Sequence, residues 1–151
     1  ALLRSWRPHS AAVTSMASAA AGTGGGALLT GGRDGRLAAW DAESLRPHFE
    51  LTADAHAVNT VCALGGLAAV AGVEAVVRII DLRSGSVVNA LGSGTRWAQA
   101  LQGSGGPAEA AKVVFASEGH AFAVTGARFV DERTLASAGA DRMVLLWDLR
   151  R

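Results

Sequence analysis

The sequence predicts an all-β protein built from short antiparallel strands. Nineteen of its 151 residues are glycine, which indicates many turns. Half of the residues are hydrophobic and only 18% are charged, so a packed core is expected rather than a disordered chain. The third observation is more specific, because one hairpin pattern occurs three times along the chain.

Each of these hairpins consists of an apolar strand, a tight turn with an acidic residue, and a second strand with alternating apolar side chains. The hairpins cover residues 28–41, 70–81 and 135–148. In the first and third, a hydroxyl residue stands four positions before an Asp, and Trp-Asp begins six positions after that Asp. The middle hairpin keeps the spacing, with Glu in place of Asp and Ile in place of Trp.

A histidine and an apolar strand precede each hairpin, and a further candidate strand follows the first two hairpins. The histidines are His9, His56 and His120. The unit is therefore predicted to be a four-stranded antiparallel meander. The acids of the first two units lie 40 residues apart, which is close to the period of four-stranded propeller blades. The predicted repeats span residues 7–51, 54–91 and 118–150.

The segment 92–112 accounts for most of the longer interval between the second and third units. It is rich in Gly and Ser and contains a short apolar run around Trp97. We interpret it as a flexible insertion between blades. The alternative is that it is the remnant of a degenerate blade, which its short length and poor alternation disfavour.

At these repeated residues the chain resembles the WD40 repeat family. The resemblance covers nearly the whole chain apart from the insertion, and it is weakest in the second repeat. It implies β-propeller blades of four antiparallel strands, each tied together by a hydrogen-bonded tetrad of His, Ser or Thr, Asp and Trp. The matching positions are His9, Thr30, Asp34 and Trp40 in the first repeat, and His120, Ser137, Asp141 and Trp147 in the third.

The chemistry of these four side chains is suited to a buried relay. An indole N–H only donates, a carboxylate only accepts, and a hydroxyl and an imidazole each do both. Every buried polar group in the blade can then be satisfied. The second repeat keeps only His56, because Val70, Glu74 and Ile80 do not complete the relay. That blade is expected to depend on apolar packing alone.

Three repeats are too few to close a ring, since closed propellers have about four to eight blades. Residues 1–151 are therefore expected to form part of one propeller domain. We expect that the chain is a piece of a longer protein, or that further strands come from a partner chain.

The sequence favours a protein-interaction scaffold without catalytic activity. A His beside an Asp and a hydroxyl residue could suggest a hydrolase, but here the combination recurs at the repeat spacing, as structure demands. An active site is normally needed once. No catalytic residues, metal site or cofactor are predicted, and the expected partners are other proteins, within a multi-subunit complex or a longer chain.

One motif points to a narrower alternative. The third repeat ends in Trp-Asp-Leu-Arg, and the second has Ile-Asp-Leu-Arg at the same place. An Arg two positions after the Asp resembles the variant found in many substrate receptors of cullin–RING ubiquitin ligases, where it contacts an acidic site on the adaptor. The residues in question are Asp81, Arg83, Asp148 and Arg150. Arg at this place is also a common solvent-exposed position.

The charge and the cysteine content bear on the function class and on the cellular compartment. The net charge is +1 and no basic block stands out, which disfavours nucleic-acid binding. Of the two long uncharged stretches, residues 10–32 are rich in Gly, Ser and Thr, and residues 57–73 are too short for a membrane span and are broken by Gly65-Gly66. Both are interpreted as paired strands, so no membrane segment is predicted. A single cysteine, Cys62, excludes an intramolecular disulfide and fits a reducing compartment. We therefore expect an intracellular protein, cytoplasmic or nuclear.

Overall fold

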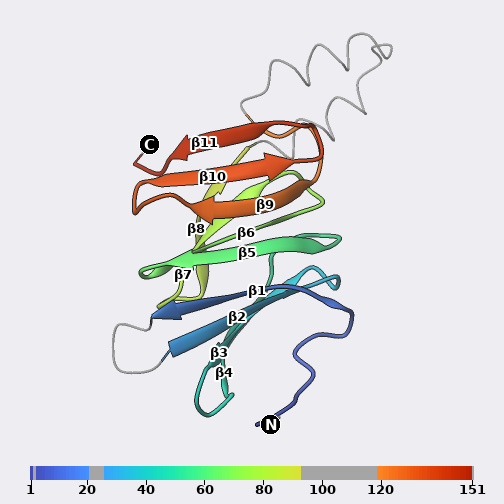
Figure 1. Cartoon of the computed structure of the whole chain (residues 1–151), viewed down its shortest axis with the longest axis vertical. Helices are drawn as coiled ribbons and strands as arrows, with labels where there is room; N and C mark the ends of the chain where they lie inside the picture. The colour runs from blue at the N-terminus through green and yellow to red at the C-terminus, as the bar shows by residue number, and fades with distance from the viewer. Residues whose placement is uncertain (2, 21–25, 93–118, 151) are drawn as a thin grey trace.

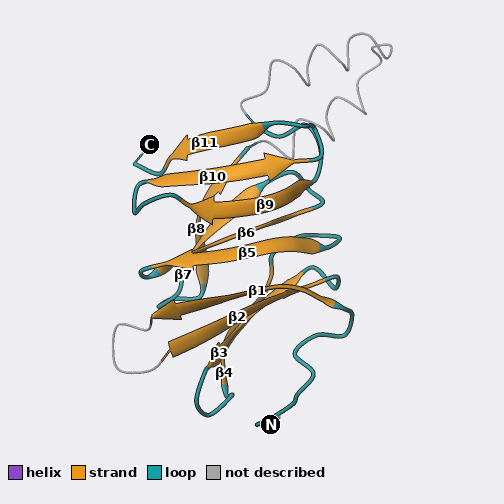
Figure 2. Cartoon of the chain, viewed as in Figure 1, coloured by secondary structure: helices purple, strands orange, loops and turns teal. Residues whose placement is uncertain are grey.

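The computed structural model describes residues 1, 3–20, 26–92 and 119–150. Within these ranges the chain forms eleven β-strands and no helix, which confirms the all-β prediction (Figure 2). No helix in the described ranges is long and apolar enough to cross a membrane. The predicted insertion lies outside the described residues, except for its first residue, Gly92.

The strands are arranged in three antiparallel meander sheets that follow one another along the chain (Figure 1). The first sheet contains β1 (Val13–Ala20), β2 (Gly26–Gly32), β3 (Arg36–Asp41) and β4 (Pro47–Thr52). The second contains β5 (Val58–Leu64), β6 (Leu67–Gly72), β7 (Val77–Asp81) and β8 (Ser86–Leu91). The third contains β9 (Val124–Phe129), β10 (Thr134–Gly139) and β11 (Val144–Asp148). These sheets are the blades of an incomplete propeller, as predicted.

The turn between the second and third strands of each blade has the same backbone conformation. The residue after the acid has a positive φ in all three: 76° at Gly35, 63° at Ala75 and 68° at Arg142. Gly35 is required for a further reason, because a Cβ there would lie 2.1 Å from the carbonyl oxygen of Asp54. This turn therefore fixes the approach of the first blade to the start of the second.

Apolar side chains fill the two interfaces between successive sheets. Leu29 and Leu37 of the first sheet pack with Val58, Val70 and Ile80 of the second, and all five are fully buried. The other face of the second sheet packs against the third sheet in the same way. The core is thus divided into two layers, and the middle blade contributes to both.

Side-chain hydroxyls also join the first strands of the three blades, β1, β5 and β9, which lie side by side (Figure 1). The Ser15 hydroxyl on β1 accepts a hydrogen bond from the Val61 backbone N–H on β5, at 3.0 Å. The Thr60 hydroxyl accepts one from the Ala127 N–H on β9, at 3.2 Å. Each blade is therefore fixed to the next by polar contacts as well as by the apolar layers.

Candidate functional site

The first blade brings together the four residues that the repeat spacing selects. His9 Nδ1 lies 3.0 Å from Asp34 Oδ1, and His9 Nε2 lies 2.9 Å from the Thr30 hydroxyl oxygen. Trp40 Nε1 donates to the same hydroxyl oxygen at 3.0 Å. Thr30 is on β2 and Trp40 on β3, so the relay connects two strands to the loop that precedes β1.

The third blade repeats this arrangement with Ser in place of Thr. His120 Nδ1 lies 2.9 Å from Asp141 Oδ2, and His120 Nε2 lies 2.7 Å from the Ser137 hydroxyl oxygen. Trp147 Nε1 donates to that oxygen at 2.8 Å. The near-identical distances in two blades indicate a structural unit.

The direction of each hydrogen bond in the relay follows from the aspartate at one end of it. Because a carboxylate only accepts, Nδ1 of the imidazole is the donor to the aspartate. Its Nε2 then accepts from the hydroxyl, whose oxygen accepts from the indole N–H. The side chains of His9 and His120 are completely shielded from solvent. Both imidazoles are therefore enclosed by the blade in which they lie.

The two relay aspartates are held in the charged form. Burial alone would raise the pKa of Asp34, but hydrogen bonds from the Arg36 and Ser10 backbone N–H groups and from His9 outweigh it, and the pKa is lowered. Burial likewise opposes the lowered pKa of Asp141, where the Ala121 N–H and His120 are the strongest opposing contributions. Both carboxylates thus tie the loop before the first strand of a blade to the hairpin turn.

In the second blade, Asp54 and not His56 stands at the histidine position. The Asp54 carboxylate is buried and accepts hydrogen bonds from the backbone N–H groups of His56, Ala57 and Glu74, at 2.9, 3.1 and 3.0 Å. His56 is exposed. The sequence prediction that His56 keeps a tetrad position in this blade was therefore wrong.

The neighbouring glycines show the equivalence of Asp54 and the relay histidines. A Cβ added to Gly72 would lie 2.7 Å from Asp54 Oδ2, just as one added to Gly139 would lie 2.5 Å from His120 Nδ1. The sequence contained a signal for this, because the relay histidines stand four positions before the first valine of their strand. Asp54 has that spacing to Val58, whereas His56 is only two positions away.

At the acidic position of the second blade, Glu74 forms an ion pair with Arg78. Glu74 Oε1 accepts a hydrogen bond from the Ala55 N–H at 3.1 Å, and Glu74 Oε2 pairs with Arg78. Burial alone would raise the pKa of Glu74, but Arg78 and the Ala55 N–H lower it overall. Val70 and Ile80 fill the hydroxyl and tryptophan positions and are fully buried. Apolar packing alone was thus too simple a prediction for this blade, which keeps a polar cluster at one end.

The aspartates of the adaptor motif, Asp81 and Asp148, are the last residues of β7 and β11, and the arginines lie on the turns that follow. Asp81 Oδ1 accepts hydrogen bonds from the Arg83 and Ser84 backbone N–H groups, at 2.8 and 3.1 Å, and the Arg83 side chain is exposed. Arg150 forms a two-point pair with Asp148, at 2.9 and 2.8 Å. The two arginines therefore differ: Arg150 has an intramolecular carboxylate partner, while Arg83 makes no side-chain hydrogen bond or ion pair within the described ranges.

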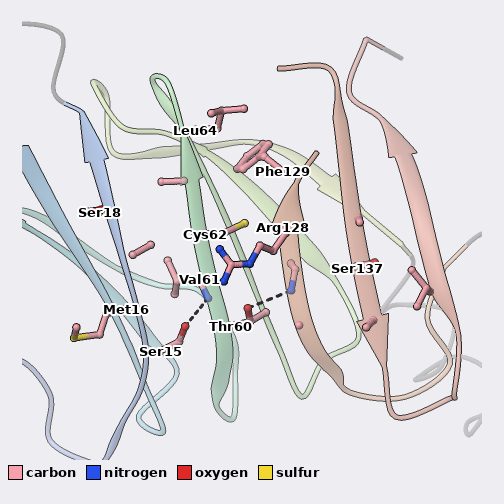
Figure 3. A pocket seen from close by; sticks show the side chains of 17 residues that line it. Ser15, Met16, Ser18, Thr60, Val61, Cys62, Leu64, Arg128, Phe129 and Ser137 are labelled. Atoms are coloured by element: carbon pink, nitrogen blue, oxygen red, sulfur yellow. Dashed lines mark hydrogen bonds between the residues drawn. The ribbon is translucent and has the colours of Figure 1, made fainter. Parts of the chain in front are cut away.

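A pocket of about 720 Å³ lies beside β1, β5 and β9 and extends to β10 and β11 (Figure 3). Seventeen residues line it, and Arg128 is the single charged one among them. This pocket was not predicted from the amino-acid sequence, because its lining comes from five strands.

Comparison with known proteins assigns the class. The family model "WD domain, G-beta repeat" matches residues 1–41 and 111–148, just over half of the chain. The chain therefore belongs to the WD40 repeat family. WD40 repeats are generally scaffolds for protein interactions, typically without catalytic activity.

Among solved structures, the chain is similar to the computationally designed Ika8 protein, with a TM-score of 0.66 and 18% sequence identity. The match covers 93% of this chain and 34% of that one, so the chain spans about a third of the length of that structure. At this identity the likeness shows the fold alone. No curated protein matches.

Proposed function

We propose that this chain is a non-catalytic protein-interaction scaffold that works inside a larger assembly, either a multi-subunit complex or a longer polypeptide. Its membership of the WD40 family supports the interaction role. The burial of both relays supports the absence of catalysis, since the histidines and their hydroxyl partners already satisfy one another.

The observation that carries the proposal is the open face of the third blade. Leu37 and Ala39 of β3 are buried against the second sheet, and the residues in register on β7, Val77 and Ile79, are buried against the third. The corresponding residues of β11, Val144 and Leu146, are 69% and 71% exposed. Apolar side chains in this position are expected to be covered by another polypeptide.

Light scattering on the purified 151-residue chain tests this proposal. We expect the wild-type chain to form species larger than 15.3 kDa, and Leu146→Lys to shift the distribution toward the monomer. Val88→Lys is the matched control, because Val88 is also exposed but lies on the outer strand β8, away from the open face. A wild-type chain that stays a monodisperse 15.3 kDa monomer would contradict the proposal.

A narrower role as a substrate receptor of a cullin–RING ubiquitin ligase is the second candidate. It is favoured by the exposed Arg83 side chain, whose guanidinium is available to an acidic site on an adaptor. Binding of a purified adaptor to the chain should weaken about tenfold in Arg83→Ala, the loss of one charge-assisted contact. Arg33→Ala, another exposed arginine, is the control. Absence of adaptor binding by the wild-type chain would exclude this role.

A further inference from the structure

The pocket beside the first strands of the blades has an unusual lining for a surface hollow. Most of its seventeen residues are small or apolar, including Val61, Leu64 and Phe129, and its single charge is the guanidinium of Arg128 (Figure 3). Arg128 is exposed on β9, and Figure 3 shows its side chain extending toward Val61 and Cys62 on β5. The guanidinium therefore lies between β9 and β5, beside other residues that line the pocket.

Three of the four hydroxyl groups that line the pocket are already engaged. The Ser15 and Thr60 hydroxyls accept hydrogen bonds from backbone N–H groups of the next blade. The Ser137 hydroxyl is bonded to His120 and Trp147. Arg128, by contrast, makes no side-chain hydrogen bond or ion pair with any part of the chain that the structure describes. Five guanidinium N–H donors are thus available to a ligand.

We propose that this pocket binds a peptide segment of a partner protein through an Asp or Glu side chain that pairs with Arg128. This inference rests on the proposed scaffold function and names the chemistry of the partner. A carboxylate matches the fork of guanidinium donors in two-point geometry, and the surrounding apolar wall lowers the competition from water. The exposed Met16 and Leu64 and the partly exposed Phe129 supply contact area for the apolar residues beside the acid.

A single positive charge distinguishes a peptide carboxylate from a polyanion. Nucleic-acid binding needs several basic groups that follow successive phosphates. The pocket offers one guanidinium among apolar and hydroxyl groups, which fits one acidic side chain in an otherwise apolar segment.

Selection from a library of random peptides displayed on phage tests the proposal, with the 151-residue chain as target and Arg128→Ala for counter-selection. Peptides that survive should carry an Asp or Glu beside apolar residues. Replacing that acid by its amide, or Arg128 by Ala, should weaken binding about tenfold. The two changes together should cost little more than either alone. Arg128→Lys should recover part of the affinity, and Arg33→Ala, an exposed arginine outside the pocket, should have no effect.

Two results would overturn the proposal: no peptide that depends on Arg128, or Arg128-dependent peptides without an acidic residue. In the first case, peptides that bind wild type and Arg128→Ala equally would leave the scaffold function intact. The scaffold function is tested separately, because the light-scattering experiment changes Leu146, which does not line the pocket, and leaves Arg128 in place.

Discussion

Replacing Ser137 by alanine removes the central atom of the relay in the third blade. The Ser137 hydroxyl oxygen is 2.8 Å from Trp147 Nε1 and 2.7 Å from His120 Nε2, and the residue is 2% exposed. Without it, the indole N–H loses its acceptor and the imidazole nitrogen loses its donor. Both groups belong to side chains packed inside the blade, so water replaces the lost contacts poorly.

The magnitude follows from the burial of the two orphaned groups. A buried polar group without a partner costs about 1–3 kcal/mol. The His120 side chain is fully shielded and incurs most of this cost, whereas Trp147 is only partly buried and loses less. We expect Ser137→Ala to lower the free energy of unfolding by about 2–4 kcal/mol. For a chain of this length that corresponds to a fall of roughly 5–15 °C in Tm.

Urea denaturation followed by tryptophan fluorescence measures this change. Ser18→Ala provides the control, because it makes the same chemical change at an exposed position of β1 and should stay within about 0.5 kcal/mol of wild type. If Ser137→Ala behaved like Ser18→Ala, the relay would contribute nothing to stability and its structural role would be refuted.

Three further changes test other parts of the fold. Asp54→Ala should cost about 2–4 kcal/mol of unfolding free energy, because three backbone N–H groups lose their acceptor. His56→Ala should cost under about 0.5 kcal/mol. Equal effects of the two changes in urea denaturation would refute the assignment of Asp54 to the histidine position of the second blade. Folding lowers the pKa of Asp141, so its carboxylate stabilises the fold above the ordinary carboxyl pKa of about 3.9, and this stabilisation is lost as the pH falls below that value. The stability of Asp141→Asn should therefore fall less steeply with decreasing pH than that of wild type. An unchanged pH profile would contradict a stabilising role of the charged Asp141. Gly35→Ala should lower Tm further than Gly65→Ala, since both have positive φ but only Gly35 also meets the backbone oxygen of Asp54; equal shifts would exclude that clash.

The fold was predictable because the hairpin register is visible in the sequence. In the first hairpin, a fixed spacing from the hydroxyl residue to the acid and on to Trp40 sets the turn, and it places Thr30 and Trp40 on the same face of adjacent strands. The third hairpin repeats this with Ser137 and Trp147. Spacing of this kind is local, and it survives in the second blade although the residues change.

The relay positions before the first strand of each blade were harder to predict. They lie in loops, where residue identity is a weaker guide than distance to the following strand. His56 was assigned to the relay because it is a histidine near Val58, but the relay position is two residues earlier, at Asp54. Asp54 can serve there because its neighbours are backbone N–H groups, which need only an acceptor. The pocket at Arg128 was not predictable, because its walls come from three different blades.

The position of the degenerate blade explains why it can lack a relay. The second sheet is covered on both faces, with Val70 and Ile80 in one apolar layer and Val77 and Ile79 in the other. Packing of this kind holds its strands without help from a tryptophan and a hydroxyl. The first and third sheets each have one covered face within the described chain, so a smaller share of their side chains is buried there. In the first and third blades the relays hold the strands together, whereas in the middle blade packing against both neighbours does so. Relay substitutions should therefore destabilise the fold most in blades that have an open face.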